Sequence, residues 1–390
     1  MLAFLGATLY TVLILLYGTL SPNLSENSND LRIYQRTGEA VLAGALPYRD
    51  FFIEYPPGSV PAFVPPAVLT DDRPSYIDLF AAEMALALVA SLFLAALAAR
   101  RLGTLPPLVP AATFAAGAMA LYPVAVTRYD AVVTLTLALA VCGAALGGRW
   151  LLLSYASLGY GAAAKLVPAL AVLPLALSGR RAVRGLLAFA AVLGLCFVPA
   201  LLFAGERFMD SFAYHAQRGV QVESLWASAL MLAGQVSGIA FEFGAFEVRG
   251  EGVGLASSLS LPVTAVLLTV TALFVYRDHR TGLAAERFPR HAAALILAFM
   301  LGSKVLSPQY MLWLLPLVPL SLGGLAGYGA CALLLAACVL TSRIFPVHYA
   351  DLLNLRTPGP ELLLARNLIL VLLWVMLLSL PQRLASREDP

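Results

Sequence analysis

The chain has 390 residues, of which 60% are hydrophobic and only 12% are charged, and its formal net charge is +3. This balance excludes an ordinary soluble globular protein, and so small a net charge gives no argument for nucleic-acid binding. Apolar runs of membrane-spanning length recur from end to end, so the composition predicts one polytopic membrane domain built from α-helices. All four cysteines lie inside apolar runs, which favours small buried thiols over a disulfide framework.

The first expected element is an apolar helix over residues 2–20. It has no basic region before it and no small-residue cleavage site after it, so we expect a retained membrane helix and not a signal peptide. A long polar loop follows, and from Asp30 to Leu42 its apolar residues fall near helical spacing with charged residues between them. This pattern indicates a helix lying in the membrane interface. Tyr55-Pro56-Pro57 then restricts the backbone directly after Glu54.

Hydropathy predicts a series of membrane crossings after this loop. Ser59–Leu69 is too short to cross at about 1.5 Å per residue, and Trp226–Phe243 carries Gln235 and Glu242, so we expect neither to cross. We expect a single transmembrane domain over 1–390, with an N-terminal module (1–204, including the loop 21–58) and a C-terminal module (205–390). With the first helix, the expected crossings number about twelve, the others being 76–99, 105–126, 130–147, 150–165, 167–178, 185–204, 255–276, 291–303, 308–322, 324–343 and 361–380.

The distribution of basic residues orients these crossings. If both termini are cytoplasmic, clusters such as Arg180, Arg181 and Arg184 fall in cytoplasmic loops, as the positive-inside rule requires. Every unusual polar motif then lies on the outer side of the membrane. Because one face is plain and the other elaborate, we expect binding or chemistry on the outer face.

Two polar motifs occur in the N-terminal module. Thr127-Arg128-Tyr129-Asp130 precedes an expected helix, so Asp130 is interpreted first as a helix N-cap. Gly159-Tyr-Gly-Ala-Ala-Ala-Lys165-Leu-Val-Pro168 places a lysine deep in an apolar run, where an unpaired charge costs about 2.5–3.5 kcal/mol. Lys165 either binds a lipid phosphate or extends to the outer membrane interface.

Two more polar motifs occur in the C-terminal module. His215 and Arg218 are three residues apart and would share a helix face, and Gln221 and Glu223 continue the polar track. Such a track suits a sugar or a phosphate, although interface anchoring also gathers these residue types. The segment 304–316 begins with Lys304, which either pairs with a phosphate or anchors the chain at the interface. We also expect Ser224 or Glu223 to cap the helix that follows.

Taken in order, these motifs resemble C-type glycosyltransferases that use polyprenyl-phosphate sugars. The closest likeness is to the bacterial polyprenol-phosphate-mannose-dependent α-mannosyltransferases (family-87-like), through Asp30…Tyr55-Pro56-Pro57, Gly…Lys165-x-x-Pro168 and Ser307-Pro308…Trp313-x-x-Pro316. The chain departs from that pattern at Tyr129-Asp130, where the family tends to have a Gly-Gln-type pair. It also departs at Gln309 and Tyr310, near which the family often has a histidine.

The resemblance implies an all-α transmembrane bundle with an outward-facing cavity, in a bacterial plasma (inner) membrane. It implies transfer of one sugar, with mannose favoured, from a polyprenyl phosphate to a hydroxyl of an envelope glycolipid or glycan, with inversion. Asp30 matches the catalytic position, against the alternative that it only caps the interfacial helix. The expected donor-phosphate-binding residues are Lys165, Arg218 and Lys304. The expected sugar-binding or acceptor-binding residues are Glu54, Tyr55, Asp130, His215, Gln221, Glu223, Gln309 and Tyr310.

No phosphate-binding loop, zinc motif or Cys-x-x-Cys pair occurs in the sequence. We therefore expect no required cofactor and no divalent metal, because the lipid-phosphate donor carries its own bond energy. The alternatives are a polyprenyl-lipid flippase or transporter, a non-catalytic assembly subunit, and arabinosyl instead of mannosyl transfer. A transporter would need charges near the membrane midplane, where Glu83 and Arg366 are the candidates and would pair with each other.

Overall fold

The structure is a computed structural model that describes residues 29–177, 181–280 and 287–380. The expected helix over 2–20 lies outside the described residues. The helices are α2 (Asn29–Leu42), α3 (Val64–Leu69), α4 (Arg73–Leu102), α5 (Leu108–Ala120), α6 (Tyr122–Thr127), α7 (Asp130–Leu146), α8 (Leu151–Ala164), α9 (Val172–Ala176), α10 (Arg181–Ala204), α11 (Met209–Gln217), α12 (Leu225–Leu232), α13 (Val253–His279), α14 (Phe288–Gly302), α15 (Met311–Leu314), α16 (Gly324–Ser342), α17 (Tyr349–Leu353) and α18 (Gly359–Ser379). The two strands are β1 (Val236–Glu242) and β2 (Ala245–Gly250).

The longest helix, α4, illustrates how the sequence defines the helix ends. The Asp72 carboxylate accepts a hydrogen bond from the Ser75 N–H at the N-terminus of α4, and Gly103 ends it in the left-handed conformation. Between Glu83 and Arg100 the helix carries no charged residue, which fits a membrane-spanning segment. Among the described residues, five helical stretches are long and apolar enough to cross a membrane, and they correspond to five of the expected crossings. They are Arg73–Leu102, Ala182–Gln217, Val253–His279, Gly324–Val347 and Gly359–Ser379.

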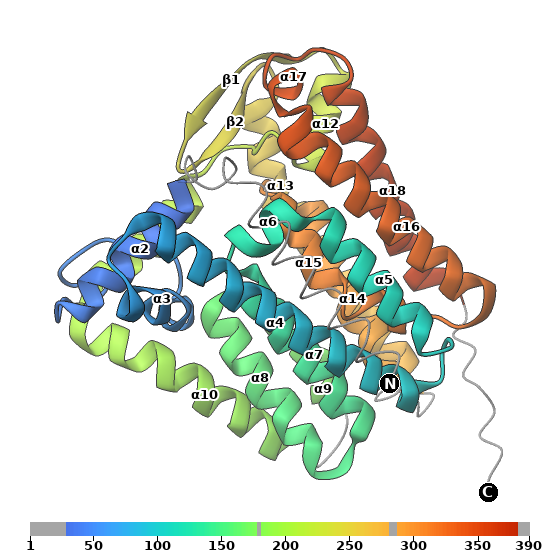
Figure 1. Cartoon of the computed structure of the whole chain (residues 1–390). Helices are drawn as coiled ribbons and strands as arrows, with labels where there is room; N and C mark the ends of the chain where they lie inside the picture. Colours follow the sequence, from blue (N-terminus) through green and yellow to red (C-terminus); the bar gives the residue numbers. More distant parts are fainter. Residues whose placement is uncertain (1–28, 178–180, 281–286, 381–390) are drawn as a thin grey trace, which may run out of the picture.

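The helices pack in two connected groups (Figure 1). In the first group α4 packs on α7, α7 on α8, and α8 on α10. In the second group α18 packs on both α14 and α16, and α13 packs on α14. Helix α14 is buried along almost its whole length, and it contacts both groups. The molecule is therefore an all-helical membrane bundle, as the sequence predicts, with one small hairpin added.

Two of the expected crossings are not continuous helices. The stretch 105–126 breaks at Leu121, where α5 ends and α6 begins just before Pro123. The stretch 308–322 contains only short helical turns, and the side chain of Trp313 within it is fully buried. Prolines at several positions in that stretch interrupt the hydrogen-bond ladder, which explains why no long helix forms there. This segment lies in the protein core.

The two ambiguous stretches do not form spanning helices, in agreement with the prediction. Ser59–Leu69 folds as a 3₁₀ turn followed by α3, and Trp226–Phe243 divides into α12 and strand β1. Ser224 caps α12 by accepting a hydrogen bond from the Ala227 N–H, as one of the two expected caps. Strands β1 and β2 pair antiparallel, with Glu242 opposite Ala245 at the turn and a bulge near Val236 and Gly238.

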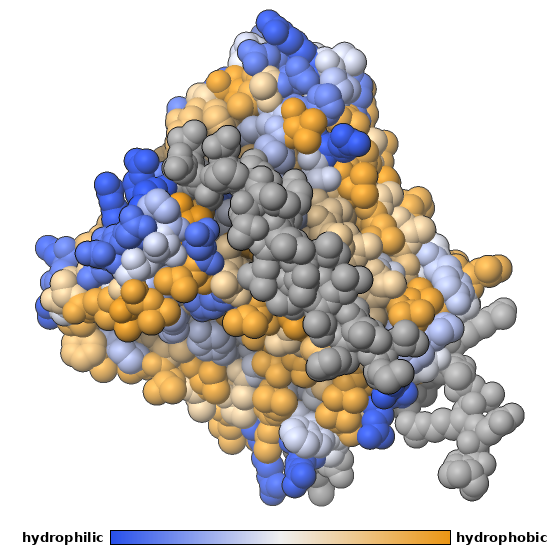
Figure 2. Space-filling view, in the orientation of Figure 1, coloured by the Kyte–Doolittle hydropathy of each residue, from blue (hydrophilic) through white to orange (hydrophobic). Residues whose placement is uncertain are grey.

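The irregular elements gather at one end of the bundle. Figure 1 shows α2 and α3 at the left of the bundle and the hairpin and α17 at its top. Figure 2 shows hydrophilic residues over this end and at the opposite end, with a hydrophobic band between them. This distribution fits a protein that crosses a membrane and carries a built-up polar face on one side.

Candidate active site

The polar end encloses a cavity of about 710 Å³ that both modules line. Its walls come from the start of α2, the 54–56 loop, the α6–α7 turn, the end of α8, α11, the hairpin, the 303–310 segment and the α16–α17 connection. All of the sequence-predicted site residues except Asp130 line it. They are Asp30, Glu54, Tyr55, Lys165, His215, Arg218, Gln221, Glu223, Lys304, Gln309 and Tyr310.

Asp30 lies in the first turn of α2 and is held by two side chains. The Tyr55 hydroxyl donates to Asp30 Oδ1 at 2.8 Å, and Arg128 Nη2 lies 2.8 Å from Asp30 Oδ2. Both carboxylate oxygens thus contact side chains from other segments of the chain. Arg128 belongs to the 127–130 motif but was not among the predicted site residues. The guanidinium of Arg128 and the hydroxyl of Tyr55 hold the Asp30 carboxylate in place, and all three residues line the cavity.

Asp130 lies directly behind the cavity wall, where it binds Lys165. Lys165 Nζ donates to Asp130 Oδ1 at 2.8 Å, and Trp313 Nε1 donates to the same oxygen at 2.9 Å. Helix α8 ends at Lys165, whose backbone is extended and whose ammonium lies 5.0–5.2 Å from the ring centres of Tyr129, Tyr310 and Trp313. The N-cap interpretation of Asp130 is wrong, because Tyr129 occupies the cap and Asp130 makes no cap hydrogen bond.

Glu54 lines the cavity from the 54–56 loop. Burial raises the pKa of the Glu54 carboxyl, the nearby negative charge of Asp30 raises it further, and Arg218 acts in the opposite direction. The Glu54 carbonyl oxygen is 2.9 Å from His215 Nε2. His215 lies on α11, which ends at Gln217, so the prediction that His215 and Arg218 share a helix face is wrong. Both residues nevertheless line the cavity.

The segment that follows α11 is held beside β2 by an isolated antiparallel β-bridge between Gln221 and Glu247. Val222 N–H donates to Phe246 O, and Val248 N–H donates to Val220 O, each at 2.9 Å. The buried Glu247 carboxylate accepts from the Gly219 N–H at 2.8 Å. The hairpin therefore positions the segment that carries Arg218, Gln221 and Glu223.

Glu247 and the hairpin, which help to build this side of the cavity, were missed by the sequence analysis. The β-branched and aromatic residues Val236, Ile239 and Phe241 were the available signal, but this stretch lies within a longer apolar run. The hairpin turn uses positive φ at Phe243 and Gly244, which the sequence did not indicate.

Two cations face the cavity from this side. Arg218 Nε is buried and has no hydrogen-bond partner among the described residues. Lys304 Nζ donates to the Ala216 carbonyl at 3.1 Å, and the Lys304 carbonyl accepts from the Gln221 N–H at 2.9 Å. Burial lowers the pKa of the Lys304 ammonium, and Glu247 offsets part of this effect. Both side chains retain donors for an anionic ligand.

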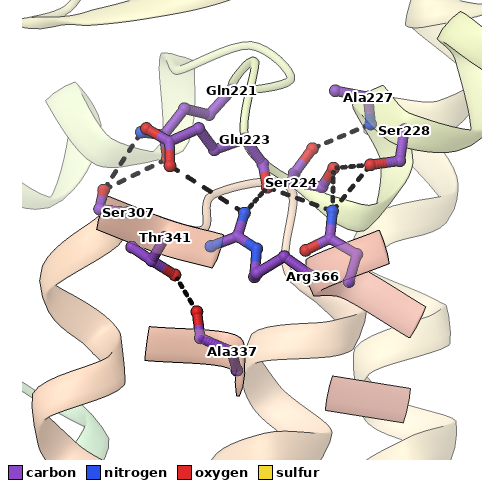
Figure 3. A network of polar contacts seen from close by, with 10 residues as sticks. Gln221, Glu223, Ser224, Ala227, Ser228, Ser307, Ala337, Thr341 and Arg366 are labelled. Atoms are coloured by element: carbon purple, nitrogen blue, oxygen red, sulfur yellow. Dashed lines mark hydrogen bonds and ion pairs between the residues drawn. The ribbon is translucent and has the colours of Figure 1, made fainter. Parts of the chain in front are cut away.

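Glu223 and Gln221 lie in a buried polar network at the same wall (Figure 3). Gln221 Nε2 donates to Ser307 Oγ at 3.2 Å. Arg366 Nη2 donates to the Glu223 carbonyl at 2.7 Å and lies 4.0 Å from Glu223 Oε2. Burial raises the pKa of the Glu223 carboxyl to about 7, with Arg366 opposing the rise. The prediction that Arg366 pairs with Glu83 is therefore wrong, since Arg366 lies against Glu223 instead.

Gln309 and Tyr310 complete the cavity beside Lys165. The Tyr310 ring stacks on Trp313 with centroids 4.1 Å apart, and Gln309 is partly exposed at the cavity wall. Across residues 29–177, 181–280 and 287–380, no three His, Cys, Asp or Glu side chains gather in a way that could hold a metal ion. The same described residues hold all four cysteines as free thiols.

The family model described as Glycosyltransferase family 87 matches residues 52–308, which is more than half of the chain. Comparison with curated protein sequences gives no match. Among solved structures, the crystal structure of ArnT from Cupriavidus metallidurans bound to undecaprenyl phosphate is similar, with a TM-score of 0.51 and 16% identity over 95% of this chain and 76% of that one. At that identity the likeness shows the fold, which is that of a C-type, multi-pass membrane glycosyltransferase. The chain belongs to glycosyltransferase family 87.

Proposed function

We propose that the protein transfers one sugar, with mannose favoured, from a polyprenyl phosphate to a hydroxyl of an envelope glycolipid or glycan. The observation that carries this proposal is the shared cavity, in which Asp30 faces the same space as Lys165, Arg218 and Lys304. The structurally similar ArnT was crystallised with undecaprenyl phosphate, which supports a polyprenyl-phosphate lipid as the donor's carrier. We place the cavity at the outer face of a bacterial plasma membrane, with both termini cytoplasmic.

The reaction that fits these groups is a single displacement with inversion. The acceptor oxygen forms a bond to the anomeric carbon of the donor sugar while the bond from that carbon to the phosphate oxygen breaks. The bonding electron pair leaves with the phosphate, and the acceptor proton passes to a carboxylate. General-base assistance of this kind contributes typically about 10²–10⁴-fold to the rate.

Asp30 is assigned as the base that accepts this proton. Arg128 and Tyr55 fix the orientation of its carboxylate, so the acceptor hydroxyl meets a positioned oxygen. Glu54 and His215 then lie near the sugar or the acceptor. Fixed positive charge at the departing phosphate stabilises the charge that develops there. Arg218 and Lys304 carry this role, together with Lys165, whose remaining ammonium hydrogens stay available beside Asp130.

Substitution of Asp30 tests the proposal directly. Asp30→Asn removes the base but keeps the side-chain shape, so it should reduce transfer by about 10²-fold or more while donor binding persists. Asp71→Asn, at an exposed position between α3 and α4, is the matched control and should behave as wild type. The assay follows radiolabelled polyprenyl-phosphate mannose with a lipid extract as acceptor.

The outcome of this assay also separates the alternatives. A fully active Asp30→Asn variant would reject the base assignment. Movement of intact lipid without sugar transfer would support a flippase, and neither activity would support a non-catalytic assembly subunit. Replacing the mannose donor by an arabinose donor in the same assay decides between the two sugars.

A further inference from the structure

The cavity-lining segment 218–224 is held by hydrogen bonds from two directions. The hairpin binds its first part, where the Gly219 N–H donates to Glu247 Oε1 at 2.8 Å. The carbonyl groups of its last two residues, Glu223 and Ser224, accept hydrogen bonds from side chains of helix α18. The position of this segment therefore depends on α18 as well as on the hairpin.

Two adjacent side chains of α18, Arg366 and Asn367, make these contacts, and both are fully buried. Arg366 Nη2 donates to the Glu223 carbonyl at 2.7 Å (Figure 3). Asn367 Nδ2 donates to the Ser224 carbonyl at 3.2 Å and to Ser228 Oγ at 2.7 Å. Ser228 lies on α12, which Ser224 caps. The two side chains thus bind both the end of the segment and the start of the helix that follows it.

The chemistry of Arg366 indicates that it holds the backbone in a defined place and does more than fill space. Arg366 is the one charged residue of α18 beyond the first turn of that helix, and a charge within a membrane-length apolar helix is costly. Both of its contacts are with Glu223, the carbonyl oxygen at 2.7 Å and carboxylate Oε2 at 4.0 Å. An apolar side chain would fill the same space without that cost, but it would leave a buried carbonyl without its donor.

The held segment begins with Arg218, which lines the cavity and whose buried Nε has no hydrogen-bond partner among the described residues. The backbone between Arg218 and Glu223 is hydrogen-bonded to β2 and to the Lys304 carbonyl, so a shift at Glu223 is passed along it. We propose that Arg366 and Asn367 are positioning residues, which hold the 218–224 segment so that Arg218 meets the phosphate of the donor. This inference rests on the proposed function.

Substitutions on α18 test the inference through the KM for the donor. Asn367→Leu keeps the size of the side chain and removes its donors, and Arg366→Met removes the guanidinium. Each should raise the donor KM by about 3- to 30-fold and leave the acceptor KM unchanged. Arg366→Lys keeps a charged donor near the Glu223 carbonyl and should recover part of the loss. The matched control is Thr341→Val, since buried Thr341 donates only within its own helix, to the Ala337 carbonyl at 2.8 Å.

Combination with Arg218→Gln separates positioning from a general loss of structure. Because Asn367 acts through Arg218, Asn367→Leu should raise the donor KM no further once Arg218→Gln is present. Farnesyl phosphate, a short prenyl phosphate, gives a second measurement that needs no sugar transfer, and its Kd in detergent should follow the same pattern. If Asn367→Leu does not purify as folded protein, Arg366→Lys takes its place in both measurements.

Several results would overturn the inference. It fails if Asn367→Leu leaves the donor KM at the wild-type value, or if its effect and that of Arg218→Gln multiply in the double variant. It also fails if Arg366→Lys is as impaired as Arg366→Met, or if the acceptor KM rises as much as the donor KM. Failure of the proposed function is a separate observation, because wild type would then transfer no sugar from any polyprenyl phosphate. The farnesyl phosphate measurement would still test the positioning of Arg218.

Discussion

The pairing of Lys165 with Asp130 gives the sharpest quantitative test of the site. Lys165 Nζ and Asp130 Oδ1 are 2.8 Å apart, and their side chains are 19% and 1% exposed. Lys165→Met keeps the length of the side chain but leaves the Asp130 carboxylate buried with Trp313 as its remaining donor. Removal of one partner from a buried ion pair costs about 3–5 kcal/mol, and we expect a loss in this range in the free energy of unfolding.

The double variant Lys165→Met/Asp130→Asn tests whether the loss of stability comes from an unpaired buried charge. Removal of both charges leaves no buried carboxylate unpaired, and the amide oxygen of the introduced asparagine can still accept from Trp313 Nε1. We therefore expect the double variant to recover all but about 1 kcal/mol of wild-type stability, because replacement of both partners of a buried pair is often near neutral. Asp130→Asn alone leaves an ammonium that is partly exposed and surrounded by aromatic rings, so it should be the milder single change.

The assay is denaturant unfolding in detergent, followed by tryptophan fluorescence, for the wild type and the three variants. The reasoning is refuted if Lys165→Met costs less than about 1 kcal/mol, or if the two single changes add up in the double variant. Sugar transfer by the double variant gives the functional answer. A stable but inactive double variant means that the Lys165 charge acts on the donor phosphate, and a stable and active one means that the pair only holds α7 and α8 together.

Two further predictions concern packing and pH. A Cβ atom at Gly58 would lie 2.5 Å from the backbone of Ala163 on α8, so Gly58→Ala should lower the free energy of unfolding by about 1–3 kcal/mol. Gly194→Ala on α10 meets nothing within 4 Å, so it should be neutral or stabilising in the same unfolding assay. Burial raises the pKa of Glu223 from 4.5 to about 7, so ionisation opposes folding and stability should fall by roughly 3 kcal/mol as pH rises through that window. Glu223→Gln should lack this part of the slope when unfolding is compared at pH 5 and pH 8; equal slopes would contradict the assignment.

The parts of the fold that follow from local sequence were predictable. Apolar runs define the long helices because a membrane requires each spanning segment to satisfy its own backbone hydrogen bonds. The interfacial helix over Asp30 to Leu42 matches α2, which covers Asn29–Leu42. The polar motifs also identified residues that line a single cavity, because charged side chains are costly within apolar runs and therefore gather where water or partners can reach them.

The parts that depend on distant contacts were not predictable. The partner of Asp30 is Arg128, and that of Lys165 is Asp130, and neither pairing has a local signal. Arg366 was expected to pair with Glu83, on the argument that two charges within apolar helices should meet. It binds the Glu223 carbonyl instead, because the 218–224 segment extends over the end of α18. Strand pairing between β1 and β2 is likewise tertiary information, and it decides where the whole cation-bearing segment lies.

The pairing of charges inside the cavity ranks the cations for binding the donor phosphate. Arg128 is paired with Asp30 and Lys165 with Asp130, whereas Arg218 Nε has no hydrogen-bond partner within the described part of the chain and Lys304 Nζ binds only a carbonyl. Each charge-assisted hydrogen bond to a phosphate is worth about 1.5–3 kcal/mol, so Arg218→Gln and Lys304→Gln should each raise the donor KM by roughly 10- to 100-fold. Kinetics at saturating acceptor measure this effect, with the exposed Arg207→Gln as the control. A larger effect on acceptor KM than on donor KM would place these cations on the acceptor side and reverse the proposed orientation of the substrates.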